Sequence, residues 1–319
     1  MTTSCTDALE MTAILADIRE GDEVIMASYN FVSAANAFVL RGAKICFVDI
    51  DPLNMNLNPA LLEAAITVKT KLIVAMHYGG VACDMDSIMA IAEKYNLLVV
   101  EDAAHCIGSF YKGRHLGTIG HLGTLSFHET KNIQCGEGGA LLINDEKFIQ
   151  RAQIVRDKGT DRSDFNKGLV KKYTWTDIGS SFGLGELNAA FLYSQLFKIQ
   201  DENNRRINLW KVYHSLFSSY FNTEIPNEPG NGHIFYVKSD SEARREKIIH
   251  VLNGSHISSA SHYEPLHLSA AGKKYGYFMG EDQFTTRGSK TLLRLPLHAE
   301  MNQEDALYVF QRFMKAYEM

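Results

Sequence analysis

Short apolar runs and helical patterns alternate along the first half of the chain. Six runs rich in Val, Ile and Leu are typical of strands that are buried on both faces of a sheet. They are EVIMAS (23–28), KICFVDI (44–50), KLIVAMH (71–77), NLLVVED (96–102), GTLSFH (123–128) and ALLIND (140–145). Helical patterns cover 6–20, 31–41, 59–67 and 85–95. The alternation predicts an α/β fold with a mainly parallel central sheet and helices on both faces. Because the last apolar runs lie close together in the sequence, we expect part of the sheet to be antiparallel.

The pattern changes in the second half. Helical patterns cover 145–157, 179–193 and 194–221, and the last is long and of mixed polarity. The segment EIPNEPGNG (224–232) predicts a loop because it holds two of the six prolines and several turn residues. A strand at 233–239 and helices at 241–252 and 303–317 follow. We therefore predict a large domain at 1–195 and a smaller C-terminal α+β domain at 196–319, which the long helix enters.

Composition and charge narrow the class of protein. Apolar residues make up 45% and charged residues 22% of the 319 residues, as in ordinary soluble globular proteins. A net charge of −5 without a basic block does not indicate a nucleic-acid partner. No apolar run approaches the roughly 20 residues of a membrane span, and no signal-peptide pattern precedes the first helix. The five scattered cysteines lack a CxxC spacing, which favours a reducing cytoplasm over zinc or disulfides.

Polar residues follow two of the predicted strands. Asp102 ends one run, and Lys131 comes three residues after another, just before the glycines of CGEGG. Ligands of open α/β sheets bind beyond the carboxyl ends of the strands. The hydroxyl-rich turn TTSCTD also begins the first helix, where hydroxyls cap the backbone and free N–H groups bind phosphate. Taken alone, each feature has a structural explanation as well: a helix cap, or a solvated acid.

Together these groups match what pyridoxal 5'-phosphate (PLP) requires. Its aldehyde condenses with a lysine, its pyridinium nitrogen stays protonated beside a carboxylate, and its phosphate needs hydroxyls and backbone N–H groups. We therefore predict a PLP site in which Lys131 is the covalent anchor and proton carrier and Asp102 pairs with the ring nitrogen.

Three segments in order resemble the signature blocks of the DegT/DnrJ/StrS sugar-nucleotide aminotransferases. They are EDAAH (101–105), SFHETKN (126–132) and GEGGALL (136–142), and the likeness runs from TSCTDAL (3–9) to LLRLPLH (292–298). The resemblance implies the fold-type I architecture of PLP-dependent transferases, which is aspartate aminotransferase-like. The segments SYNFVSAANAFVLRGA, HYGGVACDMD and KYTWTDIGSS are most similar to the dTDP-4-dehydro-6-deoxyglucose 4-aminotransferases.

The resemblance also implies roles for residues at the cofactor. Cys5, Thr6 and Ser126 would lie at its phosphate, Phe31 would stack on its ring, and His105 would contact the ring hydroxyl or face. For Phe31 the structural alternative is a core phenylalanine.

Further residues would belong to the substrate and to a homodimer with shared active sites. Ser181 would reach the phosphate in the partner subunit, although many relatives have asparagine there. Tyr263 and His267, in HYEPLH, are candidate substrate residues. Relatives usually carry a leading segment before the phosphate-binding turn, on which we expect full activity and dimer stability to depend, and the region 222–233 resembles a shortened one.

The implied reaction moves an amino group from L-glutamate to the 4-keto group of dTDP-4-dehydro-6-deoxyglucose, for surface polysaccharide such as O-antigen. Two alternatives stay open: a 3-aminotransferase, and a truncated PLP-binding or regulatory relative without turnover. Both configurations at C4 are compatible with these residues. Related dehydratases carry histidine in place of Lys131, and no GxGxxG follows the first strand as nicotinamide binding would require.

Overall fold

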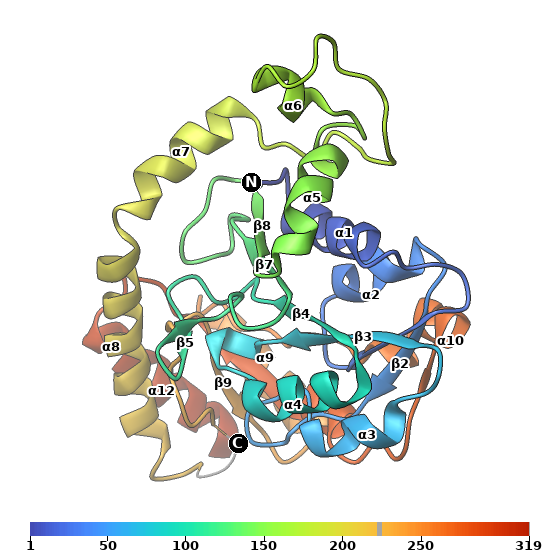
Figure 1. Cartoon of the computed structure of the whole chain (residues 1–319). Helices are drawn as coiled ribbons and strands as arrows, with labels where there is room; N and C mark the ends of the chain where they lie inside the picture. Colours follow the sequence, from blue (N-terminus) through green and yellow to red (C-terminus); the bar gives the residue numbers. More distant parts are fainter. Residues whose placement is uncertain (222–224, 319) are drawn as a thin grey trace.

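A seven-stranded sheet forms the centre of the computed structural model, which describes residues 1–221 and 225–318 (Figure 1). Its strand order is β10-β2-β1-β3-β4-β7-β8. All neighbouring strands are parallel except β7 and β8, which are antiparallel. The strands are β1 Glu23–Ala27, β2 Lys44–Val48, β3 Thr70–Met76, β4 Leu98–Asp102, β7 Leu122–Ser126, β8 Gly139–Ile143 and β10 Gly276–Phe278. The predicted mainly parallel α/β fold and its six strands are confirmed.

The helices and short strands complete the chain. The helices are α1 Cys5–Leu15, α2 Val32–Val39, α3 Leu62–Ala65, α4 Met85–Tyr95, α5 Ile149–Arg156, α6 Arg162–Asn166, α7 Glu186–Leu196, α8 Ile199–Phe217, α9 Glu242–Gly254, α10 Ala270–Tyr275, α11 Thr285–Thr291 and α12 Gln303–Glu318. Single 3-10 turns lie at Pro59–Leu61, Tyr78–Gly80, Glu146–Phe148 and Leu266–Leu268. The remaining strands are β5 Phe110–Tyr111, β6 Arg114–His115, β9 Phe235–Lys238 and β11 Leu292–Leu295. No described helix has the length and apolarity that crossing a membrane requires.

Both faces of the sheet are covered, which explains why its strands are continuously apolar. Successive residues of a strand point to opposite faces. Accordingly Ile25 and Val99 belong to one core cluster, which includes side chains of α3 and α4, whereas Val24 and Val100 belong to a second, which includes side chains of α1, α2 and α5 (Figure 1). Burial on both faces therefore selects Val, Ile and Leu at every position.

Three predicted helices differ clearly from the observed ones in where they begin, end or break. The helix expected at 6–20 ends at Leu15, because Asp17 adopts a left-handed backbone conformation with φ of 54°. The helix expected at 179–193 begins only at Glu186, where Gly185 is the N-cap residue. The helix expected at 194–221 is divided between the end of α7 and α8.

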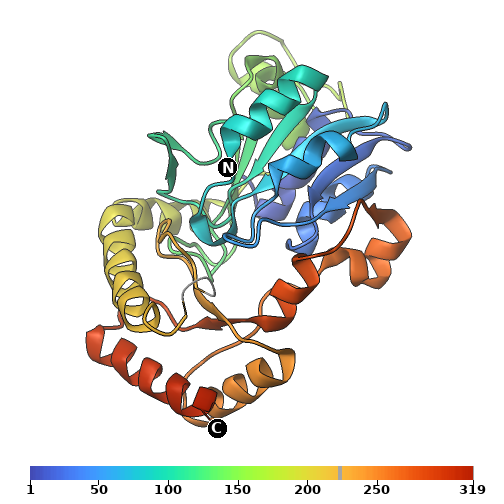
Figure 2. The ribbon, with the colours of Figure 1, turned by 90° about the horizontal axis from the view of Figure 1, so that it is seen from below.

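A second core lies outside the large sheet. The strands β9 and β11 pair antiparallel, and α8, α9 and α12 pack around them at one end of the molecule (Figure 2). The side chains of Phe217, Phe235 and Phe313 are fully buried there. By contrast, β10 returns to the large sheet and pairs with β2. The domain boundary at 195 and 196 stays a prediction, and residues 222–224, which include the start of the predicted loop and shortened region, lie outside the described residues.

Candidate active site

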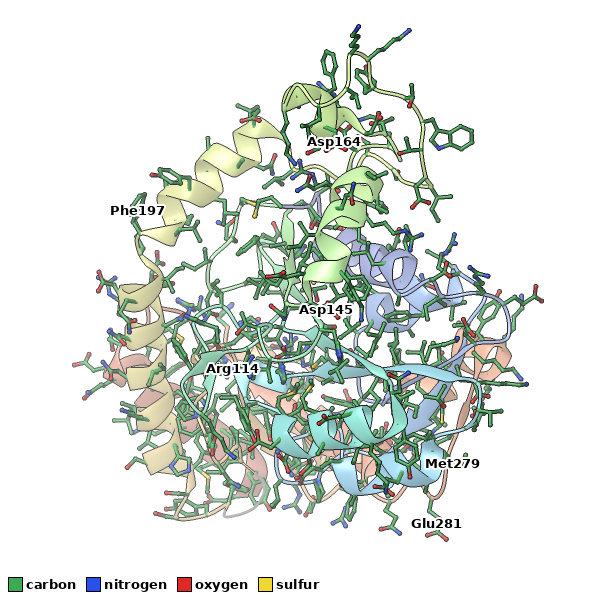
Figure 3. All side chains as sticks on the ribbon, viewed as in Figure 1. Arg114, Asp145, Asp164, Phe197, Met279 and Glu281 are labelled. Carbon is green, nitrogen blue, oxygen red and sulfur yellow. The ribbon has the colours of Figure 1, made fainter. Side chains whose placement is uncertain are left out.

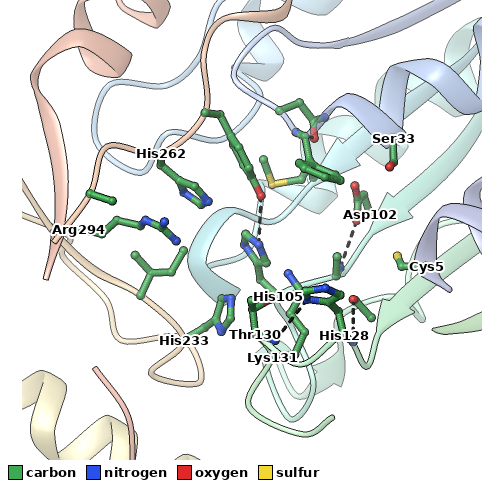
Figure 4. Close-up of a pocket in the computed structure, with 18 of the residues that line it drawn as sticks. Cys5, Ser33, Asp102, His105, His128, Thr130, Lys131, His233, His262 and Arg294 are labelled. Atoms are coloured by element: carbon green, nitrogen blue, oxygen red, sulfur yellow. Dashed lines mark hydrogen bonds between the residues drawn. The ribbon is translucent and has the colours of Figure 1, made fainter. Parts of the chain in front are cut away.

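A pocket of about 910 Å³ opens where the strands of the large sheet end (Figure 4). Met76, Asp102 and Ser126, the last residues of β3, β4 and β7, all line it. The starts of α1 and α2 contribute a second wall. The segment 258–263, together with β11 and the residues just after it, contributes a third. The pocket therefore lies at the carboxyl edge of the sheet, where the strand pattern predicted a ligand site.

Most of the residues singled out from the sequence meet in this pocket. Those that line it are Cys5, Thr6, Phe31, Asp102, His105, Ser126, Lys131 and Tyr263. Ser181 and His267 do not. Ser181 is exposed and forms a β-bridge with Asp157. His267 bonds with Ser28 Oγ through Nδ1 (2.7 Å) and lies 3.1 Å from an Asp282 carboxylate oxygen through Nε2. The roles inferred for these residues stay predictions.

Lys131 presents an amine of reduced basicity to the pocket. It lies in the turn after β7, where its backbone N–H donates to the carbonyl of His128 (2.9 Å). Burial lowers the pKa of the Lys131 amine, and the charge of Arg294 adds to this, while Cys5 and Asp102 oppose it. Since the uncharged amine is the nucleophile and the base, a lowered pKa increases the fraction that reacts at neutral pH.

Asp102 is a buried carboxylate that no described residue neutralises directly. Its side chain is almost fully buried and accepts a hydrogen bond from the Ala104 N–H (3.2 Å). Burial raises the pKa of the Asp102 carboxyl, which the Ala104 N–H and the charge of Lys131 partly oppose. A cationic ring nitrogen placed beside it would relieve this cost. Burial raises the pKa of the Cys5 thiol, and the charge of Asp102 adds to the effect.

Two helix N-termini meet at the opposite wall. Ser4 caps α1 by accepting a hydrogen bond from the Asp7 N–H (3.0 Å), and Thr6 donates one to Ser33 at the start of α2 (2.8 Å). Free N–H groups and hydroxyls at such ends bind phosphate. Phe31, the N-cap of α2, is 52% exposed and lines the pocket. The core alternative for Phe31 therefore does not hold.

The glycine run after Lys131 allows this wall to form. Gly139 in β8 exchanges two backbone hydrogen bonds with Thr2 (2.8 and 2.9 Å), which fixes the turn before α1. A Cβ atom on Gly139 would lie 2.3 Å from the Ser4 carbonyl oxygen. Only glycine allows β8 to approach the turn before α1 this closely.

One buried group has an unused donor. The Nδ2 of Asn30, just before Phe31, has no hydrogen-bond partner among the described residues, although it lies in the pocket wall. A buried donor of this kind is costly unless a ligand accepts from it. The pocket thus holds an amine, a carboxylate, two helix N-termini and the free donor of Asn30. This set of groups fits PLP.

His105 is held between two partners. Its Nδ1 accepts from the Gly79 N–H (3.2 Å), so the ring proton lies on Nε2 and faces the Tyr263 hydroxyl at 3.2 Å. Burial lowers the pKa of His105 well below its usual value, with the charge of Lys131 adding to the effect. His105 is therefore a neutral group that positions Tyr263 in the pocket.

The sequence reasoning missed several residues of the pocket. His262 and Arg294 line it, and both lie in segments quoted for the family resemblance, HYEPLH and LLRLPLH. His233 also lines the pocket, and the centroid of its ring lies 4.5 Å from the ring centroid of His105. His233 follows a loop and carries no motif, so only the fold brings it to the site.

The chain is similar to a defined group of proteins along its whole length. A model of the DegT/DnrJ/EryC1/StrS aminotransferase family matches residues 1–314. The spore coat polysaccharide biosynthesis protein SpsC of Bacillus subtilis (strain 168) is 32% identical over 314 residues, which cover 95% of this chain and 81% of SpsC. An aminotransferase of the family from Brucella abortus has a TM-score of 0.91 at 28% identity, covering 100% of this chain and 85% of its own. The PLP-form of Spr1654 from Streptococcus pneumoniae has a TM-score of 0.90 at 26% identity, covering 99% and 86%.

Proposed function

Because the chain belongs to the DegT/DnrJ/EryC1/StrS aminotransferase family, whose members depend on PLP, we propose that it transfers an amino group from L-glutamate to a nucleotide-linked keto sugar. The acceptor is the 4-keto group of dTDP-4-dehydro-6-deoxyglucose, and the product a dTDP-4-amino-4,6-dideoxyhexose for surface polysaccharide. One observation carries the proposal: Lys131 and Asp102 line the same pocket as two helix N-termini. The name of SpsC supports a role in polysaccharide synthesis.

Each residue contributes one step that its surroundings favour. PLP, when bound, supplies an electron-withdrawing ring. Asp102 would hold the proton on the ring nitrogen, because its buried carboxylate lacks an ion-pair partner among the described side chains. Lys131 would bind the cofactor and then, as an uncharged amine, accept the proton from the α-carbon of the donor. Thr6 and Ser126 would donate hydrogen bonds to the phosphate, and Phe31 would cover the ring.

A homodimer with shared sites forms part of the proposal. Four large apolar side chains on and just after α7 are exposed: Leu187 by 87%, Phe191 by 48%, Tyr193 by 65% and Phe197 by 75% (Phe197 is labelled in Figure 3). Apolar surface of this extent indicates an interaction site. Ser181 precedes α7 and is exposed as well, so a partner bound here could receive it in its own phosphate site. We place the dimer in the cytoplasm.

The decisive assay combines the PLP-loaded protein with L-glutamate and dTDP-4-dehydro-6-deoxyglucose and determines the product by NMR. Amination at C4 is expected, and the spectrum also gives the configuration. Amination at C3 of a related keto sugar would instead support the 3-aminotransferase. Bound PLP without turnover on any keto sugar would support the regulatory relative.

Replacing Lys131 by Ala tests the anchor directly. We expect Lys131→Ala to abolish turnover and the visible absorbance of the lysine-bound cofactor, because no other described lysine lines the pocket. The matched control is Lys247→Ala, which removes an exposed lysine on α9 and should leave both unchanged. A Lys131→Ala protein that turned over at close to the parental rate would disprove the assignment.

A further inference from the structure

Arg294 is a cation in the pocket wall without an anionic partner. It lies on β11, and its Nε is buried with no hydrogen-bond partner among the described residues. None of the ion pairs between described residues involves its guanidinium. Arg206, the other arginine of the pocket, differs, because it faces Glu202 (3.5 Å) and donates to the Leu297 carbonyl (3.0 Å). Arg294 as a whole is partly buried, but a buried guanidinium N–H without a partner is costly unless a ligand supplies the acceptor.

His262 lies beside Arg294 in the pocket wall, as Figure 4 shows. Its Nδ1 lies 2.7 Å from the Tyr78 hydroxyl, whose own pKa burial raises well above 10. Burial, with the charges of Arg294 and Lys131, lowers the pKa of His262 to about 2, so the ring stays neutral. With the Tyr78 hydroxyl as the donor in this contact, the one ring proton lies on Nε2, which no other described residue engages in a hydrogen bond. In this tautomer the wall offers a charged fork and a neutral N–H.

We propose that Arg294 and His262 form the carboxylate-binding subsite for the amino donor, an inference that rests on the proposed function. Two donors on one wall match the two oxygens of a carboxylate. An α-amino acid carries its carboxylate one bond from the carbon that reacts, so a subsite for it must lie near Lys131. Arg294 satisfies this condition, because it lines the same pocket as Lys131. In the sugar nucleotide, by contrast, the diphosphate lies across the hexose ring from the 4-keto group. A subsite for the diphosphate would therefore lie farther from Lys131 than one for the amino-acid carboxylate.

The test measures binding of glutarate, a dicarboxylate that cannot react, to the PLP-loaded protein by calorimetry. Arg294→Gln should weaken glutarate binding by about 30-fold, in line with the loss of a charge-assisted hydrogen-bonded pair. Arg206→Gln is the matched control, since it removes the same charge from the same pocket and should change the affinity by less than about threefold. Arg294→Lys, which keeps the charge and loses the fork, should fall between the two. Circular dichroism spectra and melting temperatures verify that each variant folds.

Three results would overturn the subsite. The first is equal glutarate affinity in the parent and in Arg294→Gln, or in Arg294→Lys if the Gln variant does not fold. The second is equal weakening by Arg206→Gln, which would indicate only the general charge of the pocket. The third is a loss of dTDP affinity in Arg294→Gln with glutarate affinity retained, which would assign Arg294 to the diphosphate. Glutarate binding needs no sugar, so a wrong choice of keto sugar would leave this result unchanged.

Discussion

Replacing Glu101 by Gln tests how the strand beneath the site is held. Glu101 is fully buried, and each of its two carboxylate oxygens accepts two hydrogen bonds. Oε1 accepts from the N–H groups of Ile119 and Gly120, both at 2.6 Å. Oε2 accepts from the Gly117 N–H at 2.8 Å and from His77 Nε2 at 3.0 Å. The carboxylate thus joins β4 to the loop before β7 and to the end of β3.

The number of hydrogen bonds that Glu101→Gln removes determines its cost in the free energy of unfolding. A glutamine has one carbonyl oxygen, so its NH2 group must face two donors whichever way the amide is turned. The His77 proton cannot move away from Nε2, because Nδ1 accepts from the Cys83 N–H (3.0 Å). Two hydrogen bonds to a charged group are lost, each worth roughly 1.5–3 kcal/mol. We therefore expect a loss of about 3–6 kcal/mol in the free energy of unfolding, a large part of a total that is typically about 5–15 kcal/mol.

The assay is urea unfolding of the PLP-loaded protein, followed by circular dichroism. Glu63→Gln is the matched control, since Glu63 pairs with Lys94 (2.9 Å) on the surface and its loss should not measurably change the midpoint. A Glu101→Gln protein that lost less than about 1 kcal/mol, the average for any substitution, would refute the reasoning.

The same network gives a pH dependence of known sign. Although burial opposes its charge, the His77 hydrogen bond and the Gly120 and Gly117 N–H groups lower the pKa of Glu101 in the folded state. Its stabilisation is then fully present above the unfolded pKa of about 4.3 and is lost as the pH falls through the lower folded value. The difference in stability between the parent and Glu101→Gln should therefore shrink in acid, and a difference that grows there would contradict this account.

Three further substitutions test the site and the second core. Asp102→Asn should lower kcat by about 100-fold or more while the lysine-bound cofactor keeps its absorbance, because the ring nitrogen would lose the anionic partner that we propose for it. Steady-state kinetics measures this, and an unchanged kcat would remove that role. Gly139→Ala should weaken PLP binding about tenfold in a fluorescence titration, since the new Cβ would meet the Ser4 carbonyl at 2.3 Å, and full affinity would show that the turn can move. Phe217→Ala should lower the free energy of unfolding in urea by about 3–5 kcal/mol because the ring is fully buried. A loss smaller than that of Tyr220→Ala, at an exposed position, would contradict the core assignment.

The sheet and the centre of the site were predictable from the sequence because both depend on local patterns. Strands covered on both faces must be apolar throughout, so their positions can be recognised without knowledge of their neighbours. In a mainly parallel sheet their carboxyl ends share one edge, which brings Asp102 and the turn with Lys131 together. The start of α1 was recognisable from its hydroxyls, and Ser4 is the cap.

The rest was decided by tertiary structure. The three residues of β10 join the large sheet from far along the chain, and a strand so short has no pattern of its own. His233, His262 and Arg294 reach the pocket only because the second core packs beside the sheet. The sequence alone determined which groups could hold the cofactor. Only the packed structure determined that a guanidinium would lie among neutral imidazoles without an anion, because burial and charge are properties of the surroundings and not of the residue.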